Sequence, residues 1–188
     1  MKIYILRHEE RTKDASFFSP LTKQGHKNAQ NLVNTLKRLN INKIYCSPYI
    51  RTLQTIHPYS NKYNIPINID YGLVEILHES IIPPKSYDVE LPDYMGDYFN
   101  INKSYYPLIT NKDLEYPEND EKLLKRTKKI FKHIIDTNKH TNNNILVVTH
   151  QGLCKNIINI KNKIENYETG QISLIFDNFE LCYKKVSI

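Results

Sequence analysis

Short apolar runs alternate along this chain with segments whose apolar residues recur every three to four positions. Residues 2–6, 43–46 and 144–148 are short runs rich in Ile, Val and Tyr, and they predict buried strands. The run at 144–148 is apolar after its first residue, which is typical of a strand inside a parallel sheet. Residues 65–69 predict a further strand at the periphery.

The helical pattern follows most of these strands. Thr22 is suited to cap a helix that continues to about Arg38, because its hydroxyl can accept a bond from a free backbone amide. Ser47 and Pro48 predict a second helix start, with an end near Ile56. Two more helices are predicted at 121–136 and 152–160. The first of these has an inward face made of Leu124, Thr127, Phe131, Ile134 and Ile135.

The C-terminal pattern differs, because two strand-like runs at 171–176 and 179–186 flank Asp177 and Asn178, a typical hairpin turn. Strands that alternate with helices predict an α/β fold. We expect a three-layer sandwich with a mostly parallel central sheet flanked by helices. The 188 residues suit a single domain covering 1–188.

The region 81–117 breaks this pattern. It contains Pro83, Pro84, Pro92, Pro107 and Pro117 and many tyrosines, and it predicts a long insertion over one face. Ordered insertions of this length often act as lids. Its tyrosines either line a substrate pocket or pack the insertion onto the domain, and the sequence leaves both interpretations open.

Composition adds three expectations. The net charge of +6 suits an anionic ligand, although solubility alone also explains it. The basic run from Lys122 to Lys132, which includes Arg126, fits a solvated helix face better than a nucleic-acid site. Cys46, Cys154 and Cys182 match no metal spacing and predict buried free thiols in a reducing, cytoplasmic setting. We expect neither a signal peptide nor a membrane span.

The candidate chemistry follows the predicted strands. Arg7 and His8 follow the first, Ser47 and Arg51 follow the second, and His150 follows the run at 144–148. Ligands of open α/β sheets bind beyond the carboxyl ends of the strands, so we expect these side chains to converge. Two histidines and two arginines would suit a phosphate dianion, since the guanidinium fork matches phosphate oxygens.

Four motifs then carry a resemblance. Arg7-His8 resembles the RHG signature of the histidine phosphatase superfamily, also called phosphoglycerate-mutase-like. Residues 21–25 (LTKQG) resemble its L-[ST]-x-x-G helix start, and residues 47–55 (SPYIRTLQT) resemble its SPxxRxxQT segment. Residues 147–152 (VVTHQG) resemble its second-histidine motif. The motifs stand in the family's order from residue 2 to about 160, and together they are specific.

A narrower resemblance also exists. Residues 7–11 (RHEER) are similar to an RHGER form, and 71–75 (YGLVE) resemble a PGLxE segment that carries an acidic residue. The stretches 105–109 and 144–148 are similar to the same branch. That branch includes the phosphatase domains of the STS/TULA proteins, which act on phosphotyrosine.

The resemblance implies a role for each site residue. His8 would attack phosphorus and become phosphohistidine, and His150 would donate to the same phosphate. Glu75 would act as general acid and then as general base, with Glu79 as the competing acid. The phosphate oxygens would be held by Arg7, Arg11 and Arg51. No metal or other cofactor is implied.

Glu9 departs from the family pattern, because it stands where the family usually has glycine. A carboxylate beside a phosphate site repels substrate unless it points away or pairs with an arginine. The leading interpretation is a phosphatase acting on a phosphorylated small molecule or a phosphopeptide. The alternatives are a phosphoglycerate mutase and a weakly active or inactive protein that binds phosphorylated ligands. Nucleic acid and membrane partners are not expected, and the sequence leaves the oligomeric state open.

Overall fold

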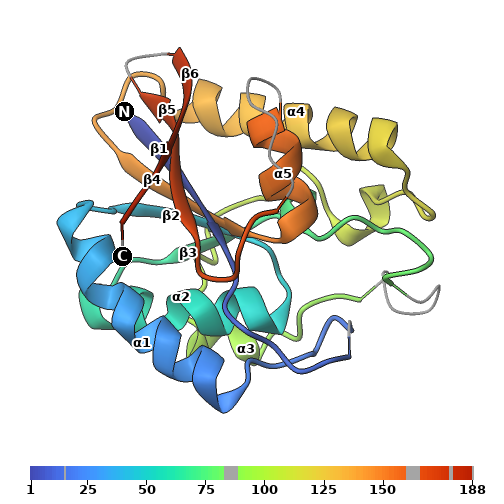
Figure 1. Cartoon of the computed structure of the whole chain (residues 1–188), viewed down its shortest axis with the longest axis horizontal. Coiled ribbons are helices and arrows are strands. Elements are labelled where there is room, and N and C mark those ends of the chain that lie inside the picture. Colours follow the sequence, from blue (N-terminus) through green and yellow to red (C-terminus); the bar gives the residue numbers. More distant parts are fainter. Residues whose placement is uncertain (15, 83–88, 160–165, 178–179, 188) are drawn as a thin grey trace.

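The computed structural model describes residues 1–14, 16–82, 89–159, 166–177 and 180–187. Its centre is a six-stranded sheet with the strand order β3-β2-β4-β1-β5-β6 (Figure 1). The strands are β1 (Lys2–Arg7), β2 (Lys43–Cys46), β3 (Ile67–Ile69), β4 (Asn144–Thr149), β5 (Ile172–Asp177) and β6 (Glu180–Lys185).

The four strands from β3 to β1 are parallel, and β5 and β6 extend the sheet in antiparallel fashion. The predicted strands and the mostly parallel sheet are therefore confirmed. The C-terminal strands pair as expected, although residues 178 and 179, where the turn was predicted, lie outside the described residues. The register places Arg7 opposite Thr149, so the carboxyl ends of β1 and β4 finish level with each other.

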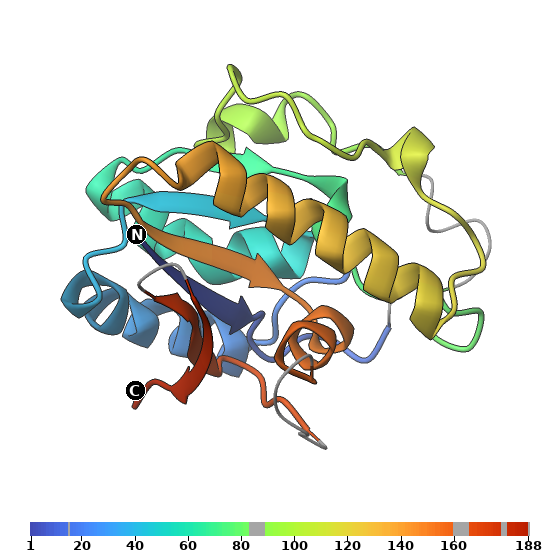
Figure 2. The same cartoon turned by 90° about the horizontal axis from the view of Figure 1, so that it is seen from above.

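Helices cover both faces of the sheet. The helices α1 (Lys23–Arg38) and α2 (Ile50–Tyr63) lie side by side on one face, and α4 (Asp120–Asn138) and α5 (Gln151–Asn159) lie on the other (Figures 1 and 2). Alternate residues of one strand point to opposite faces: Tyr4 and Leu6 join the core beneath α1 and α2, while Ile3 and Ile5 join the other. The predicted three-layer α/β arrangement is confirmed.

The start of α1 was predicted correctly from its cap residue, whereas the end of α2 depends on packing. Thr22 caps α1 as expected and accepts a hydrogen bond of 3.0 Å from the amide of Gly25. The expected end of α2 near Ile56 is wrong, since the helix begins at Ile50 and continues through Pro58 to Tyr63. Burial of Tyr59 at 3% exposure extends the apolar face past the proline and offsets the lost backbone bond.

The buried face of α4 differs in part from the predicted one. Thr127, Phe131 and Ile134 are buried as predicted, while Leu124 and Ile135 are only half-buried. Arg126 is 8% exposed, so its assignment to a solvated basic face is wrong. Its guanidinium lies among backbone carbonyls and next to Glu118.

The expected insertion forms little regular structure in its described parts, 81–82 and 89–117. These parts contain α3 (Met95–Tyr98) and η3 (Asn111–Asp113), and Ile101 forms a bridge with Ile67 at the free edge of β3. The hydroxyl of Tyr105 donates to Asp70 at 2.9 Å, and Tyr116 donates to the carbonyl of Ile82. Tyr105 thus ties the insertion to the end of β3, and Tyr116 joins the two ends of the insertion, whereas other tyrosines are exposed, namely Tyr94, Tyr98 and Tyr106.

The cysteines follow the sheet. Cys46 and Cys154 are buried free thiols, as predicted. Cys182 is only partly buried, which corrects the third prediction, because it lies on β6 at the edge of the sheet. Within the described ranges, none of the helices has the length and apolar character needed to cross a membrane.

Candidate active site

The carboxyl ends of β1, β2 and β4 bring the predicted histidines together. The amide of His8 donates to the carbonyl of Thr149, and the amide of Ser47 donates to that of Val148, both at 3.0 Å. The rings of His8 and His150 lie 5.2 Å apart in an edge-to-face arrangement. The backbone bonds continue the sheet ladder by one residue, which fixes where both side chains leave the sheet.

His8 is 3% exposed, and one of its ring nitrogens is already used. Its Nδ1 lies 2.7 Å from the carbonyl oxygen of Glu9. A carbonyl only accepts hydrogen bonds, so this contact assigns the proton to Nδ1 and leaves the lone pair on Nε2. Burial, together with the charge of Arg51, lowers the pKa of His8 to about 3. The ring is therefore neutral near pH 7 and carries a free nucleophilic nitrogen.

His150 is fully buried and is held from the opposite side. Its Nε2 lies 2.8 Å from the hydroxyl of Ser47, and its buried Nδ1 has no hydrogen-bond partner in the part of the chain that the structure describes. Burial and the charge of Arg51 lower the pKa of His150 well below the usual value. In the tautomer in which Ser47 donates to Nε2, the single ring proton stands on Nδ1 and is available to a bound anion.

Arg7 and Arg51 each combine an anchored end with an unpartnered donor. Arg7 donates through Nη1 to the carbonyl of Tyr167 at 2.5 Å, and Arg51 donates through Nη1 to Ser16 at 2.9 Å. The Nε of each is buried and has no hydrogen-bond partner among the described residues. Burial lowers the pKa of Arg51 to about 10, which leaves it charged at neutral pH. Unpaired buried donors are costly, and here they lie next to the two histidines.

Arg11 is less buried than Arg51 and is bound by its own loop. Its Nη1 donates to the carbonyls of Thr12 and Asp14, each at 2.6 Å. Its charge still reaches the site, because it contributes to lowering the pKa of both His8 and Arg51. Arg11 is therefore a peripheral cation, held by its own loop.

Glu75 reaches the group from the segment that follows η1 (Tyr71–Leu73). Its Oε1 accepts from the amide of Gly152, at the start of α5, and from the amide of Ile76, both at 3.0 Å. Within the residues that the structure describes, Oε2 accepts no hydrogen bond. Its charge raises the pKa of Arg7, against the stronger lowering by burial. Glu75 thus lies close to Arg7 and Arg51, and its carboxylate is bound to Gly152, two residues after His150 in the sequence.

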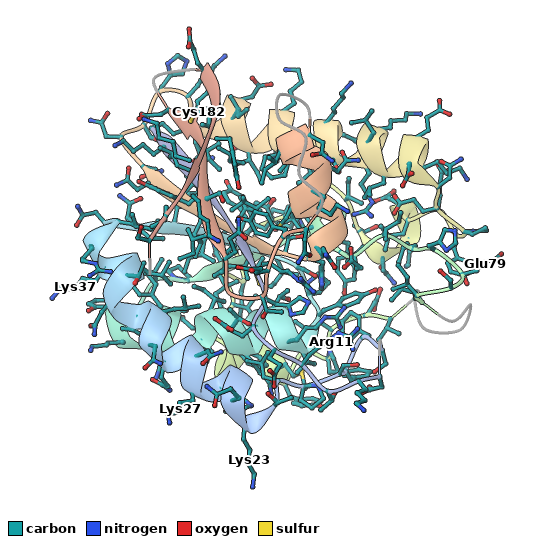
Figure 3. All side chains as sticks on the ribbon, in the orientation of Figure 1. Arg11, Lys23, Lys27, Lys37, Glu79 and Cys182 are labelled. Carbon is teal, nitrogen blue, oxygen red and sulfur yellow. The ribbon has the colours of Figure 1, made fainter. Side chains whose placement is uncertain are left out.

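The competing acid lies elsewhere. Glu79 is exposed and projects from the outer edge of the molecule (Figure 3). His78 makes a local contact, with its Nδ1 2.8 Å from the hydroxyl of Ser80. The geometry therefore favours Glu75 over Glu79.

Glu9 points away from the histidines. Its carboxylate accepts from Nδ2 of Asn28 in α1 at 3.3 Å, and a Cβ on Gly170 would stand 2.2 Å from its Oε1. Gly170 lies two residues before β5, so the carboxylate lies on the opposite side of β1 from His150 and Ser47. Burial raises the pKa of Glu9.

Hydrogen bonds between side chains of one motif and the backbone of another hold the motifs together, which the sequence pattern did not predict. The side chain of Gln54 accepts from the amide of Leu21 at 2.7 Å, and Thr55 accepts from the amide of Glu9 at 2.9 Å. The rings of Tyr49 and His150 pack with their centroids 5.0 Å apart. The guanidinium carbon of Arg51 lies 4.6 Å from the centroid of the Tyr49 ring. Ser47 and Tyr49 therefore belong to the site. The sequence signal for Ser47 was its place directly after a strand.

A surface hollow beside α4 lies apart from this group. The hollow is lined mainly by lysines and acidic residues of α4 and the segment before it, and it contains none of the predicted site residues. In the described ranges, no group of three or more His, Cys, Asp or Glu side chains is placed to hold a metal ion. The arrangement of charged groups at the strand ends is instead suited to an oxyanion.

Comparison with known proteins gives a family and a fold. The model of the histidine phosphatase superfamily (branch 1) matches residues 3–183. A search of curated proteins finds no match. Among solved structures, the ecdysone phosphate phosphatase of Bombyx mori in complex with tungstate superposes with a TM-score of 0.74 at 13% identity, covering 100% of this chain and 92% of the other.

Two bacterial structures are similarly related. YhfR of Bacillus stearothermophilus has a TM-score of 0.70 at 21% identity, with coverage of 98% of this chain and 95% of that one. A putative alpha-ribazole-5'-P phosphatase of Escherichia coli has a TM-score of 0.68 at 19% identity, with coverage of 100% and 96%. At these identities the superpositions establish the shared fold.

Proposed function

Because the chain belongs to the histidine phosphatase superfamily, we propose that it hydrolyses phosphate monoesters through a phosphohistidine formed on His8. One observation carries the proposal. Among the described residues, three buried nitrogens have no hydrogen-bond partner, Nε of Arg7, Nε of Arg51 and Nδ1 of His150, and they accompany a neutral His8 that has its proton on Nδ1. A phosphate dianion would satisfy both arginine nitrogens and a protonated Nδ1 of His150 at once, and its phosphorus would face Nε2 of His8.

The reaction proceeds in two displacements. In the first, Nε2 of His8 forms a bond to phosphorus, the ester P–O bond breaks, and the carboxyl proton of Glu75 passes to the leaving oxygen. In the second, a water oxygen bonds to phosphorus, the N–P bond breaks, and Glu75 takes the proton of that water. The products are the alcohol and inorganic phosphate, and His8 returns to its neutral form.

The arginines supply most of the stabilisation. The transferred phosphoryl group spreads charge over three oxygens, and positioned cations lower the energy of that state. Arg7 and Arg51 are buried in part or fully, so their fields are weakly screened, while Arg11 acts from the rim. The proposed chemistry uses no metal, since the arginines provide the positive charge.

The phosphohistidine proposal predicts a simple result. The protein, treated with EDTA, should hydrolyse p-nitrophenyl phosphate between pH 5 and 7, and quenching in alkaline detergent should trap a phosphoenzyme that is stable in base and lost on later treatment with acid. His8→Ala should remove both signals, with a loss of roughly 10⁴-fold or more for a residue that forms the covalent intermediate. Turnover that survives in His8→Ala would refute the proposal.

The substrate class is a separate question. A panel should include a phosphotyrosine peptide, because the RHEER form is similar to the STS/TULA branch, together with ecdysone phosphate and alpha-ribazole-5'-P, the compounds named for the related structures. The quantity to compare is kcat/KM.

No observation favours the two alternative functions. The binding-only interpretation depended on Glu9 repelling the phosphate, and its carboxylate lies against Asn28 and Gly170 instead. A mutase would transfer the phosphoryl group between glycerate positions faster than it hydrolyses the phosphoenzyme. Incubation with phosphoglycerate, followed by measurement of transferred and of released phosphate, distinguishes a mutase from a phosphatase.

A further inference from the structure

A buried ion pair lies outside the phosphate-binding group. Arg126 in α4 and Glu118, just before that helix, are 8% and 4% exposed. They form two parallel hydrogen bonds, from Nε of Arg126 to Oε1 of Glu118 at 2.8 Å and from Nη2 to Oε2 at 2.6 Å. Neither residue belongs to the motifs of the sequence, and the proposed reaction does not use them.

The remaining donors of Arg126 all bind the segment that carries Glu75. Nη1 donates to the carbonyls of Gly72 and Val74 at 2.9 Å each, and Nη2 donates to the carbonyl of Glu75 itself at 3.3 Å. A guanidinium has five N–H donors, and the two bonds to Glu118 and these three use every one. The contacts therefore require the forked geometry of arginine, in addition to a positive charge.

Glu118 binds the other end of the same segment. Its Oε2 accepts from the amide of Leu77 at 3.2 Å, and its own amide donates to the carbonyl of Leu77 at 2.9 Å. The pair thus contacts the backbone on both sides of Glu75, at 72, 74, 75 and 77. In this segment, which is outside the sheet, these bonds replace the ladder that holds His8 and His150.

We infer that the ion pair of Arg126 and Glu118 is a positioning device for the carboxylate of Glu75, and this inference rests on the proposed function. The pair fixes the backbone on each side of Glu75, so that Oε1 meets the amide of Gly152 and Oε2 is directed to the leaving oxygen. Buried ion pairs add little net stability relative to apolar pairs of the same volume, so the contribution of this pair is the geometry that it imposes. The two residues touch no substrate and act through Glu75.

The test compares leaving groups. Arg126→Lys keeps the charge but cannot make five hydrogen bonds, and Glu118→Gln keeps the shape but offers one acceptor oxygen. For phenyl phosphate, whose leaving oxygen needs a proton, each variant should lose roughly 10- to 100-fold in kcat, a share of the usual contribution of general acid catalysis. For p-nitrophenyl phosphate, whose leaving group needs little help, the burst of nitrophenolate should stay within about threefold of the wild type.

Glu75→Gln provides the reference and a double-variant cycle. It should show the same dependence on leaving group, and adding Arg126→Lys should cost less than about threefold more, because the carboxylate being positioned is gone. Lys128→Arg, at an exposed position of the same helix, is the matched control and should behave as wild type. If one of the two variants at Arg126 and Glu118 does not fold, the other carries the test.

Three outcomes separate the possibilities. Equal losses for both leaving groups, or losses that add to those of Glu75→Gln, would overturn the positioning role and leave a structural one. Wild-type rates for both substrates in Arg126→Lys and Glu118→Gln would also overturn it. If Glu75→Gln itself keeps the wild-type dependence on leaving group, the acid role in the proposed function fails instead.

Discussion

The side of the site built on the strands and the side that carries Glu75 are held by different means. His8 and Ser47 extend the backbone ladder of the sheet by one residue, and His150 directly follows β4. Glu75 lies in an irregular segment, and its backbone is fixed by the buried side chains of Arg126 and Glu118. The first side therefore depends on backbone pairing, and the second on side chains distant in the sequence.

This difference explains where substitutions should act. On the strand side, positions are over-determined by the sheet, so a substitution there removes a chemical group and leaves its neighbours in place. On the Glu75 side, a substitution that removes no reactive group can still displace one. The predictions below examine the two sides in turn, beginning with the largest effect.

Loss of a buried cation should produce the largest effect after loss of the nucleophile. Arg51→Ala removes a guanidinium that is 2% exposed, and kcat/KM for p-nitrophenyl phosphate should fall by roughly 10³-fold or more. Arg38→Ala is the control, because Arg38 is an exposed arginine at the end of α1. Steady-state kinetics measures both. A loss under tenfold would show that Arg51 does not hold the transferred phosphoryl group.

On the Glu75 side, Gly152→Ala should displace the carboxylate without removing it. An added Cβ would stand 2.5 Å from Oε1 of Glu75, so the side chain must move. We expect kcat for phenyl phosphate to fall by roughly 10- to 100-fold, with a smaller loss for p-nitrophenyl phosphate. Gly96→Ala is the matched control, since its nearest neighbour would be 3.8 Å away. Equal rates for the two variants would contradict the placement of Glu75.

The buried histidines should make the strand side sensitive to acid. The pKa of His8 is lowered to about 3 in the folded protein, below an unfolded value of about 6.5. The unfolded chain therefore binds more protons below pH 6.5, and stability falls as the pH drops from about 6.5 towards 3. One such histidine costs up to about 1.4 kcal/mol per pH unit.

Urea unfolding between pH 6.5 and 4.5 measures this dependence. His8→Gln should flatten it, whereas His26→Gln, at an exposed position of α1, should leave it unchanged. An unchanged slope in His8→Gln would mean that His8 titrates normally when folded.

The smallest effect is expected at Glu9. Since its carboxylate faces Asn28 and Gly170, removing the charge by Glu9→Gln should change kcat/KM by less than about threefold. Gly170→Ala should lower kcat/KM more than Glu9→Gln does, because it would place a Cβ 2.2 Å from Oε1 of Glu9 in a backbone conformation with φ of +69°. A large gain of activity in Glu9→Gln would show that Glu9 does weaken phosphate binding.

Much of the strand side was predictable. The pattern of apolar residues located every strand of the sheet, and the motifs placed His8, Arg7, Arg51 and His150 at strand ends, where the structure brings them together. Pattern reading failed at Arg126, which stands among lysines and has the period of a solvated face. Its burial follows from Glu118, eight residues earlier, and from carbonyls more than fifty residues away.

The sequence by itself determined the α/β layering, since strand and helix periods are local and each element needs an apolar face to bury. It also determined which residue types stand after each strand. Only the tertiary structure decided which nitrogen of His8 is free, that Glu9 turns away from the site, and that Arg126 and Glu118 flank Glu75. These depend on single hydrogen bonds between distant segments, whose partners become neighbours only when the sheet and helices pack.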